Sequence, residues 1–105
     1  MSLKMNSDQI LKSNPHSSTT LPLPDGWSRQ GHTLTRTWRF EGDEAPLLWV
    51  NHVWALAQAH QHHPDVELSY GRVTLHLTTH DAGALTDKDL SLALEINALA
   101  LTTLT

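Results

Sequence analysis

Two histidine-containing clusters hold the residues of this chain whose types suit acid–base chemistry. The first is the run His60-Gln61-His62-His63-Pro64, and the second is Thr79-His80-Asp81. Imidazole exchanges protons near neutral pH, because its ordinary pKa of about 6.5 lies there, and it is also a common metal ligand. With eight histidines in 105 residues, these clusters are the first candidates for catalysis or metal binding.

Strand pairing predicts that the two clusters meet. Apolar residues alternate with polar ones in the segments 66–70 and 73–79, which predicts two strands joined by a tight turn. Because such strands are antiparallel neighbours, the start of the first lies beside the end of the second. His62 and His63 precede the first strand and His80 closes the second. We therefore expect these three histidines at one end of a sheet.

The residues alone leave three interpretations of this convergence open. In a structural one, the histidines cap helix carbonyls and make ordinary loop hydrogen bonds. In a second, they bind zinc, with Asp65 and Asp81 nearby in the sequence. In the third, imidazoles donate and accept protons without a metal.

The remaining elements define the expected fold. A polar leader at 1–20 precedes a single domain at 21–105, and the order β-β-α-β-β-α is typical of hairpins combined with helices. The sequence thus predicts an α+β fold, a four-stranded antiparallel sheet with helices packed on one face. The expected segments are a hairpin from 27–30 and 33–40, a helix over 44–60, the two strands above, and a helix after Thr86 to about 103.

Three details of these elements can be tested by a structure. The helix at 44–60 carries an apolar arc wider than one sheet face covers, which indicates a partner helix, with another subunit as one possible source. Arg36 shares a strand face with apolar residues, so we expect it first at a sheet edge, or else extended toward solvent or in contact with an anionic group. The final helix is expected to bury the stripe Leu90, Ala93, Leu94 and Leu101.

Composition excludes several classes of function. A net charge of −4 with only seven Lys and Arg argues against nucleic-acid binding and against a polybasic membrane surface. The absence of cysteine excludes disulfides, thiolate metal sites and cysteine nucleophiles. No apolar run approaches the length of a membrane span, so we expect a cytoplasmic protein.

The spacing around the histidines resembles a known signature. His62-His63-Pro64 is followed by Tyr70, by His80 and by Asp89 at intervals similar to those of the pterin-4a-carbinolamine dehydratases. The resemblance extends over about residues 21–100. One position departs from it, since Gln58 stands where the family usually has a glutamate, and glutamine cannot supply that negative charge.

The resemblance implies a hydro-lyase, 4a-hydroxytetrahydrobiopterin dehydratase, which removes water from the 4a-carbinolamine to give quinonoid dihydropterin. It implies His62, His63 and His80 as catalytic residues, with His63 mainly orienting the substrate. Asp89 would fix an imidazole tautomer or, alternatively, act in a capping box with Thr86. Trp27 would line the pocket or, alternatively, belong to the core. No metal or other cofactor is implied.

Two other functions remain open. The chain could be a non-catalytic binding or assembly module of the same fold, or a small histidine-based metal protein. The expected partners are a small-molecule pterin and further copies of the chain in a homodimer or homotetramer, with no nucleic acid and no membrane.

Overall fold

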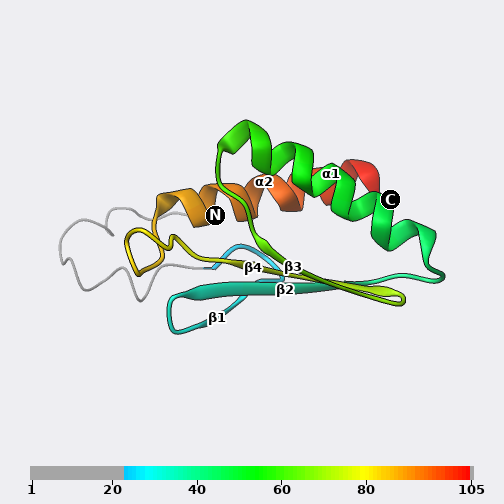
Figure 1. Cartoon of the computed structure of the whole chain (residues 1–105), viewed down its shortest axis with the longest axis horizontal. Coiled ribbons are helices and arrows are strands. Elements are labelled where there is room, and N and C mark those ends of the chain that lie inside the picture. The colour runs from blue at the N-terminus through cyan, green and yellow to red at the C-terminus, as the bar shows by residue number, and fades with distance from the viewer. Residues whose placement is uncertain (1–22, 105) are drawn as a thin grey trace.

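A computed structural model describes residues 23–104 of the chain (Figure 1). Four strands and two helices follow one another in the order that the sequence predicts. The leader expected at 1–20 lies outside the described residues. The elements are β1 (Ser28–Gln30), β2 (Thr33–Arg39), α1 (Glu44–His60), β3 (Asp65–Ser69), β4 (Arg72–Leu77) and α2 (Asp87–Thr103).

The strands form one antiparallel sheet in the order β1-β2-β4-β3. The two hairpins are joined through β2 and β4, which pair from Leu34↔Leu77 to Arg39↔Arg72. Both helices lie over one face of this sheet, and α1 packs beside α2 (Figure 1). The predicted α+β fold is therefore confirmed.

The core fills the space between the sheet and the two helices. Successive side chains of a strand point to opposite faces, so β2 and β4 each turn one row of apolar residues toward the helices. Within this core Trp38 lies between two other tryptophans. Its ring centroid is 5.8 Å from that of Trp27 and 5.3 Å from that of Trp49. The buried apolar residues are Trp27, Leu34, Trp38, Trp49, Val53, Ala57, Val73, Leu75, Leu77, Leu92, Ala93 and Ile96.

Helix α1 has the bounds that the sequence predicts. Its first turn contains a proline, which lacks an N–H that the first turn of a helix would leave unbonded in any case. Leu47, Leu48 and Trp54 remain exposed on the side of α1 away from the sheet. The buried residues of α1 are Pro46, Trp49, Val53 and Ala57.

The stripe expected for α2 is wrong in part. Leu94 and Leu101 are exposed, while Leu92, Ala93 and Ile96 are buried against the sheet. The buried face also contains Asp89, a polar residue with hydrogen-bond partners at the site described below. Within residues 23–104, no helix is long and apolar enough to cross a membrane.

The expected edge position of Arg36 is correct in part. Its strand, β2, lies between β1 and β4, but β1 pairs only with Thr33 to Thr35, so Arg36 has a neighbouring strand on the β4 side alone. Arg36 faces the helices and is half-buried, because its guanidinium stacks on Trp38, 4.7 Å from the ring centroid, and bonds to Asn97 of α2. Polar partners on α2 thus allow a charge on the helix-facing side of β2.

Candidate functional site

A tight turn at the end of α1 sets the direction of His62 and His63. The N–H of Gln61 donates to the carbonyl of Gln58, and the N–H of His62 donates to the carbonyl of Ala57, both at 3.1 Å. This pair of bonds is a Schellman motif. Gln61 adopts the left-handed conformation, with φ of 53°, that most helices reserve for glycine at this position. The chain then turns through His62-His63-Pro64 into β3.

The loop after β4 carries His80. Thr79 forms an isolated bridge with Ala84, and its carbonyl accepts the N–H groups of Ala82 and Gly83 at 3.1 and 3.0 Å. Gly83 has φ of 61°, a value that favours glycine. These contacts fold the loop back on itself and hold His80 beside the start of β3.

The three histidines line one cavity, as strand pairing predicts. Its volume is about 310 Å³, at the small end of the range for ligand sites. We call it the histidine cavity. Its lining residues are Gln61, His62, His63, Thr78, Thr79, His80, Asp81 and Lys88.

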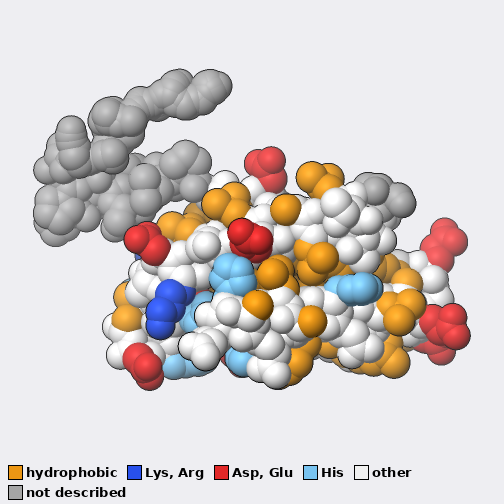
Figure 2. Space-filling model, turned by 90° about the horizontal axis from the view of Figure 1, so that it is seen from above, with side chains coloured by type: hydrophobic (Ala, Val, Ile, Leu, Met, Phe, Trp, Pro, Cys, Tyr) orange, Lys and Arg blue, Asp and Glu red, His pale blue; other side chains and the backbone are white. Residues whose placement is uncertain are grey.

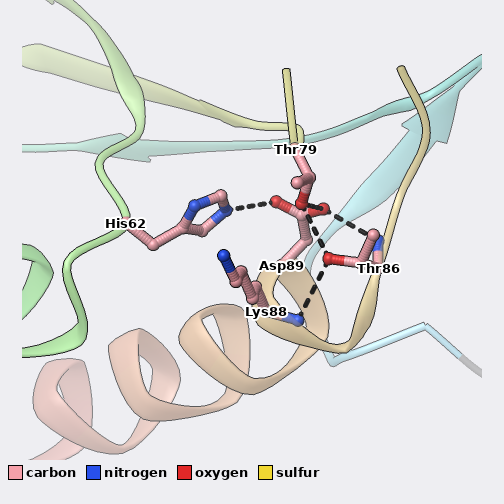
Figure 3. Close-up of polar contacts among 5 residues, drawn as sticks. All are labelled: His62, Thr79, Thr86, Lys88 and Asp89. Carbon is pink, nitrogen blue, oxygen red and sulfur yellow. Dashed lines mark hydrogen bonds and ion pairs between the residues drawn. The ribbon is translucent and has the colours of Figure 1, made fainter. Parts of the chain in front are cut away.

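A buried carboxylate, Asp89, lies behind His62 (Figure 3). Its side chain is fully buried and its Oδ1 lies 2.6 Å from Nε2 of His62, whose own side chain is 12% exposed. The other oxygen, Oδ2, accepts the hydroxyl hydrogen of Thr79 at 2.7 Å and the backbone N–H of Thr86 at 3.0 Å. Asp89 also lies in the first turn of α2, where the helix dipole favours negative charge. These contacts compensate the cost of burying the carboxylate.

The hydrogen positions of this network follow from its chemistry. Because Thr79 gives its one hydroxyl hydrogen to Asp89, the hydroxyl of Thr86, 2.7 Å away, donates to Thr79. The oxygen of Thr86 in turn accepts the backbone N–H of Lys88 at 3.3 Å. An ionised Asp89 can only accept, so Nε2 of His62 carries a hydrogen and donates it to Asp89. In neutral His62 the lone pair is then on Nδ1.

His63 has a different environment. Its Nε2 lies 2.8 Å from the side-chain oxygen of Gln58, and its ring lies 4.6 Å from that of Trp54, centroid to centroid. Both contacts are to α1, and His63 is exposed. The structure therefore separates the two adjacent histidines, one held by a buried carboxylate and the other held against the helix surface.

Of the other expected site residues, one bonds to His62 of the histidine cavity and one lies in the core. Asp89 acts in both expected ways, since it completes a capping box with Thr86 and bonds to His62. Trp27 is buried in the core, bonds to Asn97 and does not line the histidine cavity. Among residues 23–104, no group of three His, Cys, Asp or Glu side chains is arranged to hold a metal ion.

Two residues of the site were not assigned a role from the sequence. Thr79 is a buried polar residue at the inward position that follows Val73, Leu75 and Leu77, and this break in the apolar alternation is the signal that could have identified it. Lys88 lines the cavity, and its side chain extends toward His62 (Figure 3). An exposed lysine in the first turn of a helix carries no such signal.

Comparison with known proteins places the chain in a family. The family model described as "Pterin 4 alpha carbinolamine dehydratase" matches residues 9–99. The chain belongs to the pterin 4 alpha carbinolamine dehydratase family. A protein of Thermomicrobium roseum, provisionally named as such a dehydratase, is 45% identical over 75 residues, covering 71% of this chain and 81% of that protein. A provisionally named dehydratase of Chloroflexus aurantiacus is 47% identical over 76 residues, covering 72% and 81%.

Solved structures with the dehydratase fold agree with this assignment. A transcriptional coactivator/pterin dehydratase from Brucella melitensis superposes with a TM-score of 0.68 at 28% identity, over 73% of this chain and 84% of that one. A pterin dehydratase-like protein, described as a RuBisCO assembly factor in the alpha-carboxysome, superposes with a TM-score of 0.57 at 16% identity, over 70% and 86%. The second likeness concerns the fold alone.

Proposed function

We propose that this chain dehydrates a 4a-hydroxytetrahydropterin to the quinonoid dihydropterin by histidine acid–base catalysis without a metal. One observation carries the proposal. His62, His63 and His80 line one cavity, and the buried carboxylate of Asp89 contacts Nε2 of His62. Membership of the dehydratase family supports the reaction class. A biopterin side chain on the substrate is part of the proposal.

The reaction requires two proton transfers. The 4a-hydroxyl leaves as water after it accepts a proton, and N5 loses its proton as the C4a–N5 double bond forms. One group must therefore donate and another must accept, and His62 and His80 reach the cavity from different elements. We assign these two transfers to His62 and His80, each transfer contributing about 10²–10⁴-fold to the rate.

Asp89 supports the role of His62. By accepting from Nε2, it leaves Nδ1 of neutral His62 as a proton acceptor, and it stabilises the imidazolium that forms when Nδ1 takes a proton. No comparable carboxylate contacts His63 or His80 within residues 23–104. We therefore assign His62 as the base, His80 as the acid, and His63 as the group that orients the pterin.

The experiment is a dehydration assay on chelator-treated full-length protein. We expect it to accelerate loss of water from chemically generated 4a-hydroxytetrahydropterin above the spontaneous rate. Activity that disappears with the chelator and returns with zinc would favour the metal interpretation. A folded protein without any activity would instead favour a non-catalytic binding or assembly module.

Replacing Gln58 with glutamate tests how His63 contributes. The carboxylate of Gln58→Glu would lie where the amide oxygen now lies 2.8 Å from Nε2 of His63. Because a nearby negative charge favours protonated imidazole, we expect the NMR titration midpoint of His63 to rise and that of His80 to stay unchanged. Gln30→Glu, an exposed residue of β1 that does not line the histidine cavity, is the control and should shift neither midpoint. Equal shifts at His63 and His80 would contradict the contact.

We also propose that the chain self-associates through α1. Leu47, Leu48 and Trp54 expose apolar surface there, and Figure 2, which looks onto the helical layer, shows hydrophobic side chains on this side of the molecule. We expect Leu47→Glu with Trp54→Lys to reduce the mass measured by light scattering to that of one chain. Leu68→Glu, an exposed apolar residue on β3, is the control. A wild-type monomer at micromolar concentration would contradict the proposal.

A further inference from the structure

Arg36 is a half-buried cation that the proposed reaction does not use. It lies on β2 facing α2, and its partner on that helix is Asn97. Asn97 follows Asp89 by eight residues, about 12 Å along the helix. This cluster is therefore separate from the histidine cavity, and it needs an explanation of its own.

A network of hydrogen bonds fixes the guanidinium of Arg36. Nη1 donates to the carbonyl of Asp25 at 2.9 Å and to the side-chain oxygen of Asn97 at 2.7 Å. That same oxygen accepts the indole N–H of Trp27 at 2.9 Å, and the Asn97 amide donates to the carbonyl of Asp25 at 3.0 Å. The guanidinium stacks on Trp38. These contacts position Arg36 before any ligand arrives.

The chain at Gly26 is also shaped around this side chain. A Cβ atom at Gly26 would lie 2.5 Å from Cζ of Arg36, and the residue has φ of 82°. The backbone conformation favours glycine here, and any larger residue would displace the guanidinium from its present place. The turn from Pro24 to Trp27 therefore holds Arg36 in a defined place.

One edge of the guanidinium has no partner among residues 23–104. Guanidinium has five N–H donors, and the two on Nη1 are both used. The three on Nε and Nη2 form the side of the group that matches the two oxygens of a carboxylate. Within the described residues the ion pairs join His62 to Asp89 and His76 to Glu67, and Arg36 belongs to neither.

A cavity of about 330 Å³ adjoins this guanidinium. Trp38, Ala100 and Leu104 give it apolar walls, and the buried indole nitrogen of Trp38 lacks a hydrogen-bond partner in the described part of the chain. We call it the Arg36 cavity. Its lining residues are Asp25, Arg36, Trp38, Asn97, Ala100, Leu101 and Leu104.

We propose that the Arg36 cavity binds a small organic carboxylate that carries an apolar group of about the size of a phenyl ring. The two carboxylate oxygens accept from Nε and Nη2 of Arg36, and the apolar group lies against Trp38 and the last turns of α2. The carboxylate of Asp25 also lines the cavity, and it opposes the anion. Asp25 meets Arg36 through its backbone carbonyl, so its side chain can be changed without removing that bond.

The test is a titration of the full chain with phenylacetate, followed through the side-chain N–H signal of Arg36 and the indole N–H signals. The neutral amide phenylacetamide is the matched ligand. We expect saturable binding of the acid, at least tenfold tighter than the amide. We expect Asp25→Asn to tighten acid binding, because it removes the opposing charge.

Two variants separate a ligand site from a purely structural network. Asn97→Asp keeps the oxygen that accepts from Trp27 and Arg36 but supplies an internal carboxylate, and Ala100→Phe fills the cavity without changing any charge. Each should weaken acid binding at least tenfold. Arg72→Gln, which removes an arginine of the exposed sheet face, should leave it within twofold. Equal affinity for acid and amide, or no saturable shift of the Arg36 signal, would overturn the proposal.

Discussion

We expect His62→Ala to lower the turnover number for pterin dehydration by about 10²–10⁴-fold, the range typical of a lost general acid or base. The effect is this large because the ring is the only one of the three cavity histidines held by a buried carboxylate within residues 23–104. We expect His80→Ala to have an effect of the same order, since the reaction needs a donor as well as an acceptor. Stopped-flow absorbance of the quinonoid product provides the measurement.

A histidine outside the cavity provides the control for both variants. His52 is exposed on α1 and lines no part of the histidine cavity. His52→Ala should keep the wild-type turnover number within a factor of two. If His62→Ala and His52→Ala had the same small effect, His62 would have no part in proton transfer.

Asp89→Asn is expected to reduce both stability and turnover. The amide has one acceptor oxygen in place of two, while the carboxylate now accepts from His62, Thr79 and the N–H of Thr86. The neutral amide also lacks the negative charge that the first turn of α2 favours, and the loss of this charge and its charge-assisted hydrogen bonds costs about 1–2 kcal/mol in the free energy of unfolding. Urea denaturation measures this loss.

The effect of Asp89→Asn on turnover follows from which ring nitrogen of His62 carries the hydrogen. In Asp89→Asn, the amide oxygen can still accept hydrogen bonds from Thr79 and Thr86. The amide N–H₂ group then faces Nε2 of His62. That nitrogen must then accept, so the ring hydrogen moves to Nδ1 and the base is lost. We expect turnover per folded molecule to fall by about 10²–10⁴-fold. The ¹⁵N shifts of His62 should show hydrogen on Nε2 in the wild type and on Nδ1 in the variant.

Asp87→Asn separates this effect from general helix weakening. Asp87 is exposed in the same first turn of α2, so its loss removes a similar dipole interaction without touching His62. It should leave turnover unchanged. An Asp89→Asn variant that lost stability but retained full turnover would show that Asp89 acts only as a helix cap.

The parts of the fold set by local patterns were predictable. The period of apolar residues gives the bounds of α1, and the capping signal at Thr86 gives the start of α2. The tight turn between β3 and β4 is enough to bring His62 and His80 to one cavity. These inferences need only neighbouring segments of chain.

The parts set by distant contacts were not predictable. The burial of Asp89 depends on His62 and Thr79, whose contacts with the carboxylate come from other parts of the chain. The apolar residues Leu92, Ala93, Ile96, Leu99 and Ala100 lie on the same face of α2, so an apolar count identifies the buried face but not these partners of Asp89. The position of Arg36 likewise depends on the order of the strands and on Asn97, 61 residues later in the chain.

The rate of dehydration with and without His62 and His80 tests the central claim most directly. The comparison uses wild-type protein and the doubly substituted His62→Ala, His80→Ala protein, both chelator-treated and both shown to be folded by circular dichroism. Our account predicts a clear acceleration by the wild type and a rate for the double variant that approaches the spontaneous one. A double variant as fast as the wild type, or a wild type no faster than the spontaneous reaction, would contradict it.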